Sequence, residues 1–135
     1  MSEPTLNATA SAKLIVSDAD LASALPLEDG DTFPAVFATA RLVALMEIAA
    51  ARVLGPFLGL GELSVGVSVD VKHTAPTPPG ATVTATARYM GREGKLFVFE
   101  VTAADGAGEV GRGRHTRAIV TADRLQAAAA KRAGS

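Results

Sequence analysis

The sequence predicts an α+β domain in which one antiparallel sheet curls around a single long hydrophobic helix. Residues 35–54 are rich in the helix formers Ala, Leu, Met and Arg. Four later segments alternate between apolar and small or polar residues, with the period of two that is typical of half-buried strands. Because the helix is apolar on most sides, we expect the strands to wrap around it.

Length and composition fit one globular domain, which we place at residues 12–132 after a flexible tail at residues 1–11. The 135 residues are 48% hydrophobic and 20% charged, which is enough to build a core. The net charge of −1 comes from scattered charges of both signs, so no nucleic-acid partner is expected. The absence of cysteine excludes disulfides, thiolate metal sites and a cysteine nucleophile. Two histidines without suitably spaced carboxylates predict no metal site, and no cofactor is expected.

No targeting or membrane segment is predicted. The N-terminus lacks a basic start followed by an apolar run, so we expect no signal peptide and a cytoplasmic protein. The longest apolar stretch, residues 33–60, is interrupted by Arg41, Glu47 and Arg52, a pattern that a membrane helix does not readily tolerate. We therefore expect no membrane partner.

The first half of the sequence predicts a strand, a loop and the long helix. Residues 13–17 (KLIVS) predict a short strand. Asp, Pro and Gly are frequent in residues 18–34 and indicate a long loop with at most a helical turn. The helix follows over residues 35–54 and ends at Gly55 and Pro56, because proline cannot donate the next helical hydrogen bond.

The second half predicts four strands joined by short turns, and then a short helix. The expected ranges are 63–73, 81–90, 95–103 and 110–120 for the strands and 122–132 for the helix. In the first of these strands the odd positions from Leu63 to His73 form one face, which we expect to point at the long helix. A strand, a long loop, one buried helix and four sequential strands together describe the hotdog fold. A doubly wound α/β fold is excluded because it needs helices between its strands.

Glu47 is the most informative residue of the predicted helix. The residues three and four positions from it are all apolar: Val43, Ala44, Ala50 and Ala51. Arg41 and Arg52 share a face about 120° away, so Glu47 has no ion-pair partner on its own helix. A buried carboxylate without a cation is costly, and we interpret Glu47 as functional. The alternative is a helix end exposed at a groove, or a capping role for another segment.

His73 and Thr39 are the other candidates for chemistry. His73 continues the strand face that is expected to meet the helix, and an imidazole there suits acid–base work at neutral pH. On its own, a satisfied core histidine would be the simpler interpretation. Thr39 lies near the expected helix N-terminus, where capping is its simplest role. It precedes Glu47 by eight positions, about 12 Å of helical rise, so the two meet only if the helix starts late or if Glu47 comes from a dimer partner.

Weaker patterns add little. Residues 106–111 match G-x-G-x-x-G, but a strand follows them, so a hairpin is expected instead of a dinucleotide site. Four basic residues share the last strand: Arg112, Arg114, His115 and Arg117. They indicate either a solvated edge or a binding site for the phosphates of coenzyme A. No G-x-S-x-G nucleophile motif is present.

Three separated segments resemble the fluoroacetyl-CoA thioesterase family. They are FPAVFATARLVALMEIA at Phe33–Ala49, VKHTAPTPPG at Val71–Gly80 and EVGRGRHTRAIV at Glu109–Val120. The resemblance implies a homodimeric hotdog enzyme that hydrolyses a short acyl-CoA thioester to the acid and free coenzyme A. The alternative is a non-catalytic acyl-CoA binding module on the same fold.

The resemblance also implies the site residues. Thr39, Glu47 and His73 match the catalytic set, with Glu47 as nucleophile or general base and His73 as general acid or base. Whether Thr39 or Glu47 attacks the substrate stays open. Substrate-binding roles are implied for Phe33, which matches an aromatic residue that covers the acyl group, and for the pocket positions Gly66 and Arg117. Gly30 departs from the family pattern, which has a second aromatic residue there, so a small acyl group other than fluoroacetyl is an equal expectation.

Overall fold

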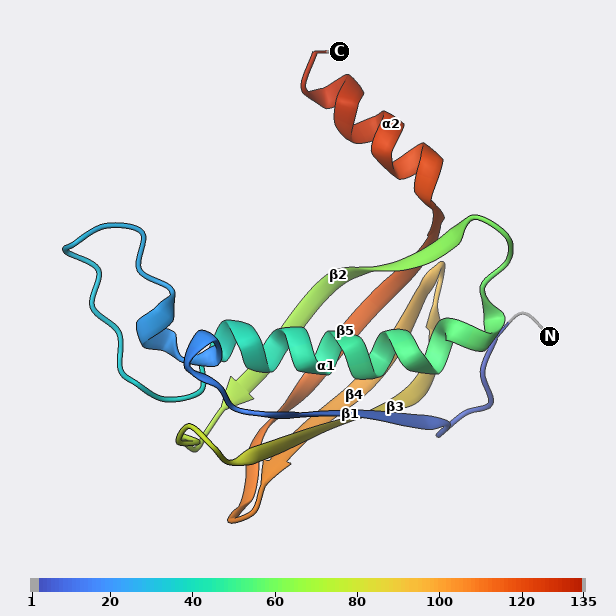
Figure 1. The fold of residues 1–135 in the computed structure, drawn as a ribbon. Coiled ribbons are helices and arrows are strands. Elements are labelled where there is room, and N and C mark those ends of the chain that lie inside the picture. The colour runs from blue at the N-terminus through green and yellow to red at the C-terminus, as the bar shows by residue number, and fades with distance from the viewer. Residues whose placement is uncertain (1–2, 135) are drawn as a thin grey trace.

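The computed structural model describes residues 3–134 as one curled sheet with a long helix across it (Figure 1). Within these residues there are two helices, five strands and three short 3-10 turns. In chain order the elements are β1 (Thr9–Ile15), η1 (Asp18–Asp20), η2 (Ala22–Ala24), α1 (Thr39–Leu54), η3 (Gly55–Phe57), β2 (Glu62–His73), β3 (Thr82–Glu93), β4 (Leu96–Asp105), β5 (Gly108–Thr121) and α2 (Ala122–Arg132).

The five strands form one sheet in the order β1-β3-β4-β5-β2. All four neighbouring pairs are antiparallel. The sheet curls around α1, which lies in its concave face (Figure 1). The predicted α+β class and hotdog arrangement are therefore confirmed. β1 and β2, which lie on either side of the helix in the chain, form the two edges of the sheet.

The core lies between α1 and the concave face of the sheet. Seven residues of α1 are buried: Leu42, Leu45, Met46, Ala49, Ala50, Val53 and Leu54. They pack against the inward side chains of β3 and β4, among which Tyr89 and Phe99 are fully buried. The opposite side of α1 is not covered, and Ile48 there is 45% exposed. The expected burial on most sides is therefore reached on one face only within a single chain.

The helix begins later than the sequence pattern suggests. Residues 35–38 were expected to be helical, but α1 starts at Thr39. Backbone hydrogen bonds hold the preceding residues extended: Phe37 N–H donates to the carbonyl of Thr77, and Ala38 N–H donates to that of Asp20. These bonds to two other segments replace the first helical turn, so the helix N-terminus lies at a junction of three parts of the chain.

A β-bulge in β2 corrects the prediction that every odd position from Leu63 to His73 faces the helix. The register with β5 shifts between Gly66 and Ser68, so one extra residue separates the two halves of the strand. Leu63, before the bulge, is 52% exposed, whereas His73, after it, shares the helix-facing side with its partner Gly111. The expectation for His73 is therefore confirmed, and that for Leu63 is wrong.

Other boundaries differ by a few residues. β1 begins at Thr9, so it includes residues expected in the tail. The β3–β4 turn is formed by Gly94 and Lys95, because β3 continues past a bulge between Tyr89 and Gly91. The hairpin expected in place of a dinucleotide motif is present between β4 and β5.

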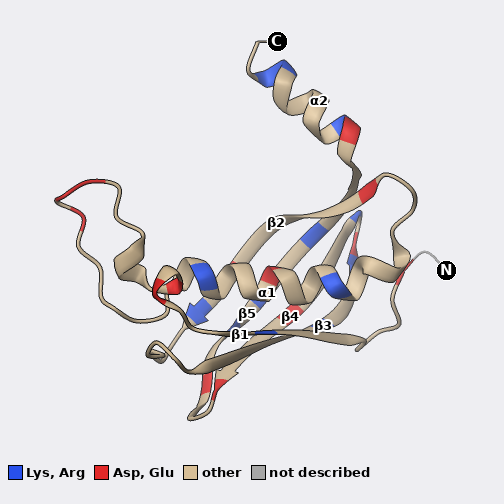
Figure 2. Cartoon of the chain, in the orientation of Figure 1, with Lys and Arg blue, Asp and Glu red and all other residues tan. Residues whose placement is uncertain are grey.

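Two segments extend away from the sheet. The loop before α1 carries Asp and Glu at its tip, and α2 projects beyond the β2 edge with both charge signs (Figure 2). None of the described residues of α2 is buried. Within residues 3–134, no helix combines the length and the apolar character needed to cross a membrane.

Candidate active site

Thr39 and His73 meet where the first turn of α1 contacts the end of β2. The Thr39 hydroxyl lies 2.8 Å from Nδ1 of His73. The N-cap of α1 is Ala38, which has no side-chain oxygen, so the predicted capping role of Thr39 is wrong. The hydroxyl is instead directed at an imidazole that is 34 positions away in the sequence. This pairing leaves the hydroxyl within reach of a base, which is the arrangement an activated nucleophile or a bound water requires.

The surroundings of His73 favour the neutral imidazole. Burial lowers the pKa of His73, and the backbone of Ala75 opposes this shift. Phe37 packs edge-on against the ring, with the ring centroids 6.5 Å apart. Nε2 is buried and has no hydrogen-bond partner among the described residues. A neutral ring with one nitrogen bound to Thr39 and the other unused can both accept and donate a proton.

A pocket opens beside this pair. Its volume is about 380 Å³, and its lining includes Pro34, Val36, Phe37, Thr39 and His73. The walls are mainly apolar. The Thr39 hydroxyl and the His73 imidazole contribute polar groups beside the first turn of α1. Phe33 precedes Pro34 directly and is 48% exposed. Phe33 is therefore next to a lining residue in the sequence, but it is not among the residues that line the pocket in a single chain.

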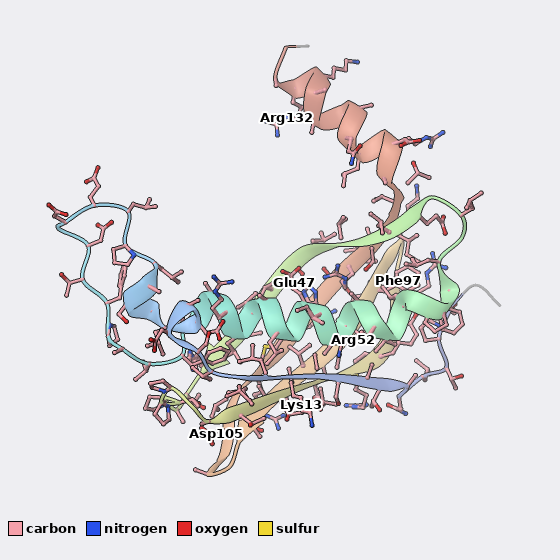
Figure 3. All side chains as sticks on the ribbon, in the orientation of Figure 1. Lys13, Glu47, Arg52, Phe97, Asp105 and Arg132 are labelled. Atoms are coloured by element: carbon pink, nitrogen blue, oxygen red, sulfur yellow. The ribbon has the colours of Figure 1, made fainter. Side chains whose placement is uncertain are left out.

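Glu47 belongs to a second cluster, further along α1. Its Oε1 accepts a hydrogen bond from Nη1 of Arg117 at 3.1 Å, and its side chain is 39% exposed. Figure 3 shows Glu47 on the side of α1 next to β2, whereas Arg52 leaves the helix towards β1. The expectation of a buried carboxylate without a cation is therefore wrong: the cation comes from β5, 70 positions away.

Gly66 permits this carboxylate to lie against β2. A Cβ atom at position 66 would lie 2.2 Å from Oε1 of Glu47 and 3.3 Å from Cε1 of His115. Real Cβ contacts are not that short, so any larger residue would displace the carboxylate. The bulge after Gly66 allows Gly66 and His73 both to face the helix, although one position is even and the other odd.

Arg117 is held by several acceptors at once. Nε donates to the Ser64 hydroxyl at 2.9 Å, and Nη2 donates to the Ser64 carbonyl at 2.9 Å. Nη1 is shared between Glu47 and Nε2 of His115, 3.1 Å from each. Burial lowers the pKa of Arg117, and Glu47 opposes this shift. A guanidinium fixed on three sides can hold the Glu47 carboxylate in one position.

The structure divides the four basic residues of β5 between the two faces of the sheet. His115 and Arg117 are buried beside Glu47. Arg112 and Arg114 are exposed and pair with Glu109 and Glu93. These four basic residues therefore do not form one cluster. Sequence reasoning missed the role of His115 in the Glu47 cluster; its spacing of two from Arg117 on a strand was the available signal.

The two clusters do not meet within one chain. α1 is unbroken from Thr39 to Leu54, so Thr39 and Glu47 are separated by about 12 Å of rise. Of the predicted catalytic residues, the structure brings Thr39 to His73 and Glu47 to Arg117 and Gly66. Among residues 3–134, no group of three side chains forms a metal site.

Comparisons with known proteins identify the family and the fold. The model of the family described as fluoroacetyl-CoA-specific thioesterase matches residues 16–123. A fluoroacetyl-CoA thioesterase from Streptantibioticus cattleyicolor is 46% identical over 95 residues, which are 70% of this chain and 68% of that protein. A structure of a variant of the fluoroacetyl-CoA thioesterase FlK with fluoroacetate matches with a TM-score of 0.89 and 35% identity, over 95% of this chain and 98% of that chain. A thioesterase superfamily member from Thermus thermophilus matches with a TM-score of 0.86 and 26% identity, over 97% and 94% of the two chains.

Proposed function

Because the chain belongs to the fluoroacetyl-CoA-specific thioesterase family, we propose that its Thr39–His73 and Glu47–Arg117 clusters together hydrolyse a short acyl-CoA thioester. The products are the free acid and coenzyme A. The observation that carries the assignment is the 2.8 Å contact between the Thr39 hydroxyl and Nδ1 of His73 at the wall of a 380 Å³ pocket. A hydroxyl, a neutral imidazole and an ion-paired carboxylate are the groups that acyl transfer needs.

Each group has a role in the proposed reaction. Hydrolysis forms a C–O bond at the thioester carbonyl, breaks the C–S bond and delivers a proton to the leaving thiolate. Glu47 acts as nucleophile or as the base that activates water, and His73 moves the proton. The first N–H groups of α1 lack partners within the helix, so they are placed to stabilise the negative charge that develops on the carbonyl oxygen. Thr39 contributes its hydroxyl at the same helix end.

A homodimer is part of this proposal. β2 is an edge strand of twelve residues, and it carries the exposed apolar side chains Val67 (53% exposed) and Val69 (43% exposed). The uncovered side of α1 continues this surface with small or apolar residues at helical spacing: Ala40, Ala44, Ile48 and Ala51. A long apolar edge favours pairing with another strand. A second copy that pairs along β2 would cover both features.

The dimer also explains why the two clusters are separate. Glu47 lies against the edge strand β2 and its side chain is 39% exposed, so we propose that it also faces the interface. Thr39 is about 12 Å away along the helix. We propose that Thr39 and His73 of one protomer work with Glu47 and Arg117 of its partner. Each dimer then contains two composite sites that are related by symmetry.

The acyl group is proposed to be small, without restriction to fluoroacetyl. The name of the relatives specifies fluoroacetyl-CoA, but Gly30 stands where the family resemblance places an aromatic residue. No atom lies within 4 Å of the position that a Cβ on Gly30 would occupy. Position 30 therefore contributes no side chain to an aromatic cover over the acyl group in this proposal.

Coenzyme A release from acetyl-, fluoroacetyl-, propionyl- and butyryl-CoA tests the activity. Glu47→Gln is expected to keep the thermal midpoint and lose most turnover, because an amide is neither base nor nucleophile near neutral pH. Glu109→Gln is the matched control: it removes another ion-paired glutamate, 2.8 Å from Arg112, on the opposite face of the sheet. Parental turnover by Glu47→Gln would remove the catalytic assignment. Binding without turnover by the parent would favour the non-catalytic acyl-CoA module.

Mixed dimers test the composite site. Thr39→Val and Glu47→Gln are each expected to be inactive alone. In a heterodimer of the two, one site combines both changes, and the other has an intact Thr39 and an intact Glu47. Random reassembly should therefore restore about a quarter of the parental activity, since half of the dimers carry one good site of two. No recovery from a reassembled mixture would place each site within one protomer, and light scattering that finds only monomer would exclude the dimer.

A further inference from the structure

His115 lies at the centre of the Glu47 cluster, and the proposed reaction gives it no task. Its side chain is 1% exposed. Nδ1 lies 2.8 Å from the carbonyl oxygen of Ser68, and Nε2 lies 3.1 Å from Nη1 of Arg117. Nε2 is also 4.0 Å from Oε1 of Glu47. A histidine so deeply buried, with both nitrogens bonded, has a defined chemical state.

The partners of His115 determine where its proton resides. A backbone carbonyl can only accept a hydrogen bond, so Nδ1 must carry hydrogen. A guanidinium can only donate, so Nε2 must offer its lone pair to Arg117. Both contacts are satisfied together by one species, the neutral imidazole protonated at Nδ1.

We propose that His115 is a positioning residue: as the neutral Nδ1-protonated imidazole, it holds Arg117 against Glu47 and makes activity depend on its own ionisation. This inference rests on the proposed function. Arg117 Nη1 lies between the two acceptors, Nε2 of His115 and Oε1 of Glu47, at 3.1 Å from each. Without the imidazole acceptor, that nitrogen would have the carboxylate alone to define its direction.

Protonation of His115 would reverse this arrangement. Nε2–H would become a donor facing the donor Nη1–H of Arg117, with two cations in contact. The imidazolium would then compete with Arg117 for Glu47, which already lies 4.0 Å away. We therefore expect acid to transfer Glu47 from Arg117 to His115 and to move the carboxylate from its position against Gly66.

The groups that face His115 keep it neutral near pH 7. Burial is the main cause that lowers the pKa of His115, and the charge of Arg117 lowers it further. The carbonyl of Ser68 on β2 and the carboxylate of Glu47 on α1 raise it. β4 contributes Phe99, an uncharged ring whose centroid is 6.5 Å from that of the imidazole. The charges of Arg117 and Glu47 shift the pKa of His115 in opposite directions, so burial determines that the pKa is lowered.

Imidazole NMR tests the protonation state without any need for turnover. The chain has two histidines, and His115→Gln identifies the signals of each. At pH 7 the ¹⁵N shifts of His115 should show a protonated Nδ1 and an unprotonated Nε2. The Arg117 side-chain signals should move with the same midpoint as His115 on acidification. A His115 protonated at Nε2 alone, or Arg117 signals that ignore its titration, would overturn the proposal even in a protein that releases coenzyme A.

Two substitutions separate positioning from packing. In His115→Gln, the amide oxygen can reach the position of Nε2 and accept from Arg117, but it does not titrate. In His115→Asn, the shorter amide can reach Ser68 only. We expect Gln to keep kcat within about threefold of the parent and to shift the acid limb of the kcat profile, because one of two titrating histidines is gone. Asn should lower kcat at least tenfold with little change in KM, and its thermal midpoint should match that of Gln.

Equal kcat in the two variants, or an acid limb in Gln that matches the parent, would mean that His115 only fills space. If Asn does not fold, the comparison of Gln with the parent and the NMR tautomer still decide the question. If the parent releases no coenzyme A, the proposed function fails, and the NMR measurements still report whether His115 positions Arg117.

Discussion

Glycine at position 66 sets how closely Glu47 approaches β2. We expect Gly66→Ala to lower turnover by about 100-fold, because the new methyl would lie 2.2 Å from Oε1 and a displacement of about 1 Å can cost that much. The backbone at Gly66 needs no positive φ, so the fold should survive. Gly106→Ala is the control, since nothing lies within 4 Å of its Cβ position and its φ is also ordinary. Turnover by Gly66→Ala equal to that of Gly106→Ala would mean that Glu47 need not touch β2.

At this scale, the sequence identifies candidates but not their partners. The sequence points to Glu47 because its own helix offers no cation, and the structure agrees on that point. Its partner Arg117 comes from another strand, and nothing local in the sequence specifies which strands meet the helix. Similarly, the pairing of Thr39 with His73 depends on where α1 starts, and that start depends on hydrogen bonds to distant loops. The resemblance placed these residues in one site, whereas composition and periodicity alone did not.

The loop before α1 controls acyl selectivity in our proposal. We expect Phe33→Ala to raise the rate with butyryl-CoA relative to acetyl-CoA, because it removes an aromatic wall near the pocket. Gly30→Phe should lower the same ratio, because its side chain has open space to occupy. A change of roughly tenfold in either direction corresponds to the low end of discrimination by one methylene. The measurement is kcat/KM for both substrates. Ratios that stay at the parental value in both variants would remove the loop from the specificity argument.

The bulge in β2 shows why a strand can be predicted while the face that it turns towards the helix is not. Apolar residues occupy every odd position from Leu63 to Val71, so the sequence carries no sign of an interruption. The extra residue between Gly66 and Ser68 changes which side those positions face. β2 is an edge strand, with a neighbour in the sheet on one side only. Such a strand can carry apolar side chains on both of its faces if a second chain covers the face that does not meet the helix. The alternation therefore predicts the strand correctly. It predicts which residues face the helix only for the part of the strand that follows the bulge.

Thr77 connects two turns at the end of the sheet that carries His73. It is fully buried, and its hydroxyl donates to Asp105 Oδ2 at 2.7 Å. We expect Thr77→Val to lower the free energy of unfolding by about 0.5–1.5 kcal/mol, the net contribution of one hydrogen bond, because water can replace the lost hydroxyl at the accessible carboxylate. The pKa of Asp105, lowered first by Thr77, should rise towards its ordinary value. Urea denaturation of the variant measures the loss.

The control for Thr77 is Thr74→Val, which removes a longer contact of 3.4 Å to the Val110 carbonyl from a residue that is exposed. Its effect on unfolding should be well below that of Thr77→Val. Equal effects in both variants would show that the tie between the turns adds no stability of its own.

For the whole molecule, the order of elements was sufficient to predict the architecture. One long apolar helix before four alternating strands leaves the curled sheet as the arrangement that buries the helix, and the structure has this form. The part that could not be predicted is the uncovered side. The sequence pattern treats α1 as buried on most sides, yet Ile48 is 45% exposed and the β2 edge is open in a single chain. Residues that contact a second chain, as proposed here, would have the same apolar pattern as core residues, so periodicity cannot separate the two.

Acid should destabilise the whole molecule in a window set by its two histidines. Burial lowers the pKa of both His73 and His115 in the folded chain, below the ordinary value of 6.5 that applies after unfolding. As pH falls through 6.5, the unfolded chain therefore binds protons before the folded chain does, and the free energy of unfolding decreases. The stability that the two neutral imidazoles contribute is fully present above pH 6.5. It is lost as the pH falls from 6.5 to their lowered pKa values in the folded chain. Carboxylates with lowered pKa, such as Asp105 and Glu109, act only below their ordinary values of 3.8 and 4.5.

Urea denaturation at half-unit steps from pH 8 to pH 5 measures this dependence. We expect a flat free energy of unfolding from pH 8 to about 7 and a decline below 6.5. His115→Gln removes one of the two titrating groups, so its decline should be shallower than that of the parent, and the double variant with His73→Gln should be flat over the same range. The more deeply buried His115 should account for the larger share. A parent that is equally stable at pH 5 and pH 8 would show that neither imidazole is held neutral by the fold, which would also remove the physical basis for His115 as the acceptor of Arg117.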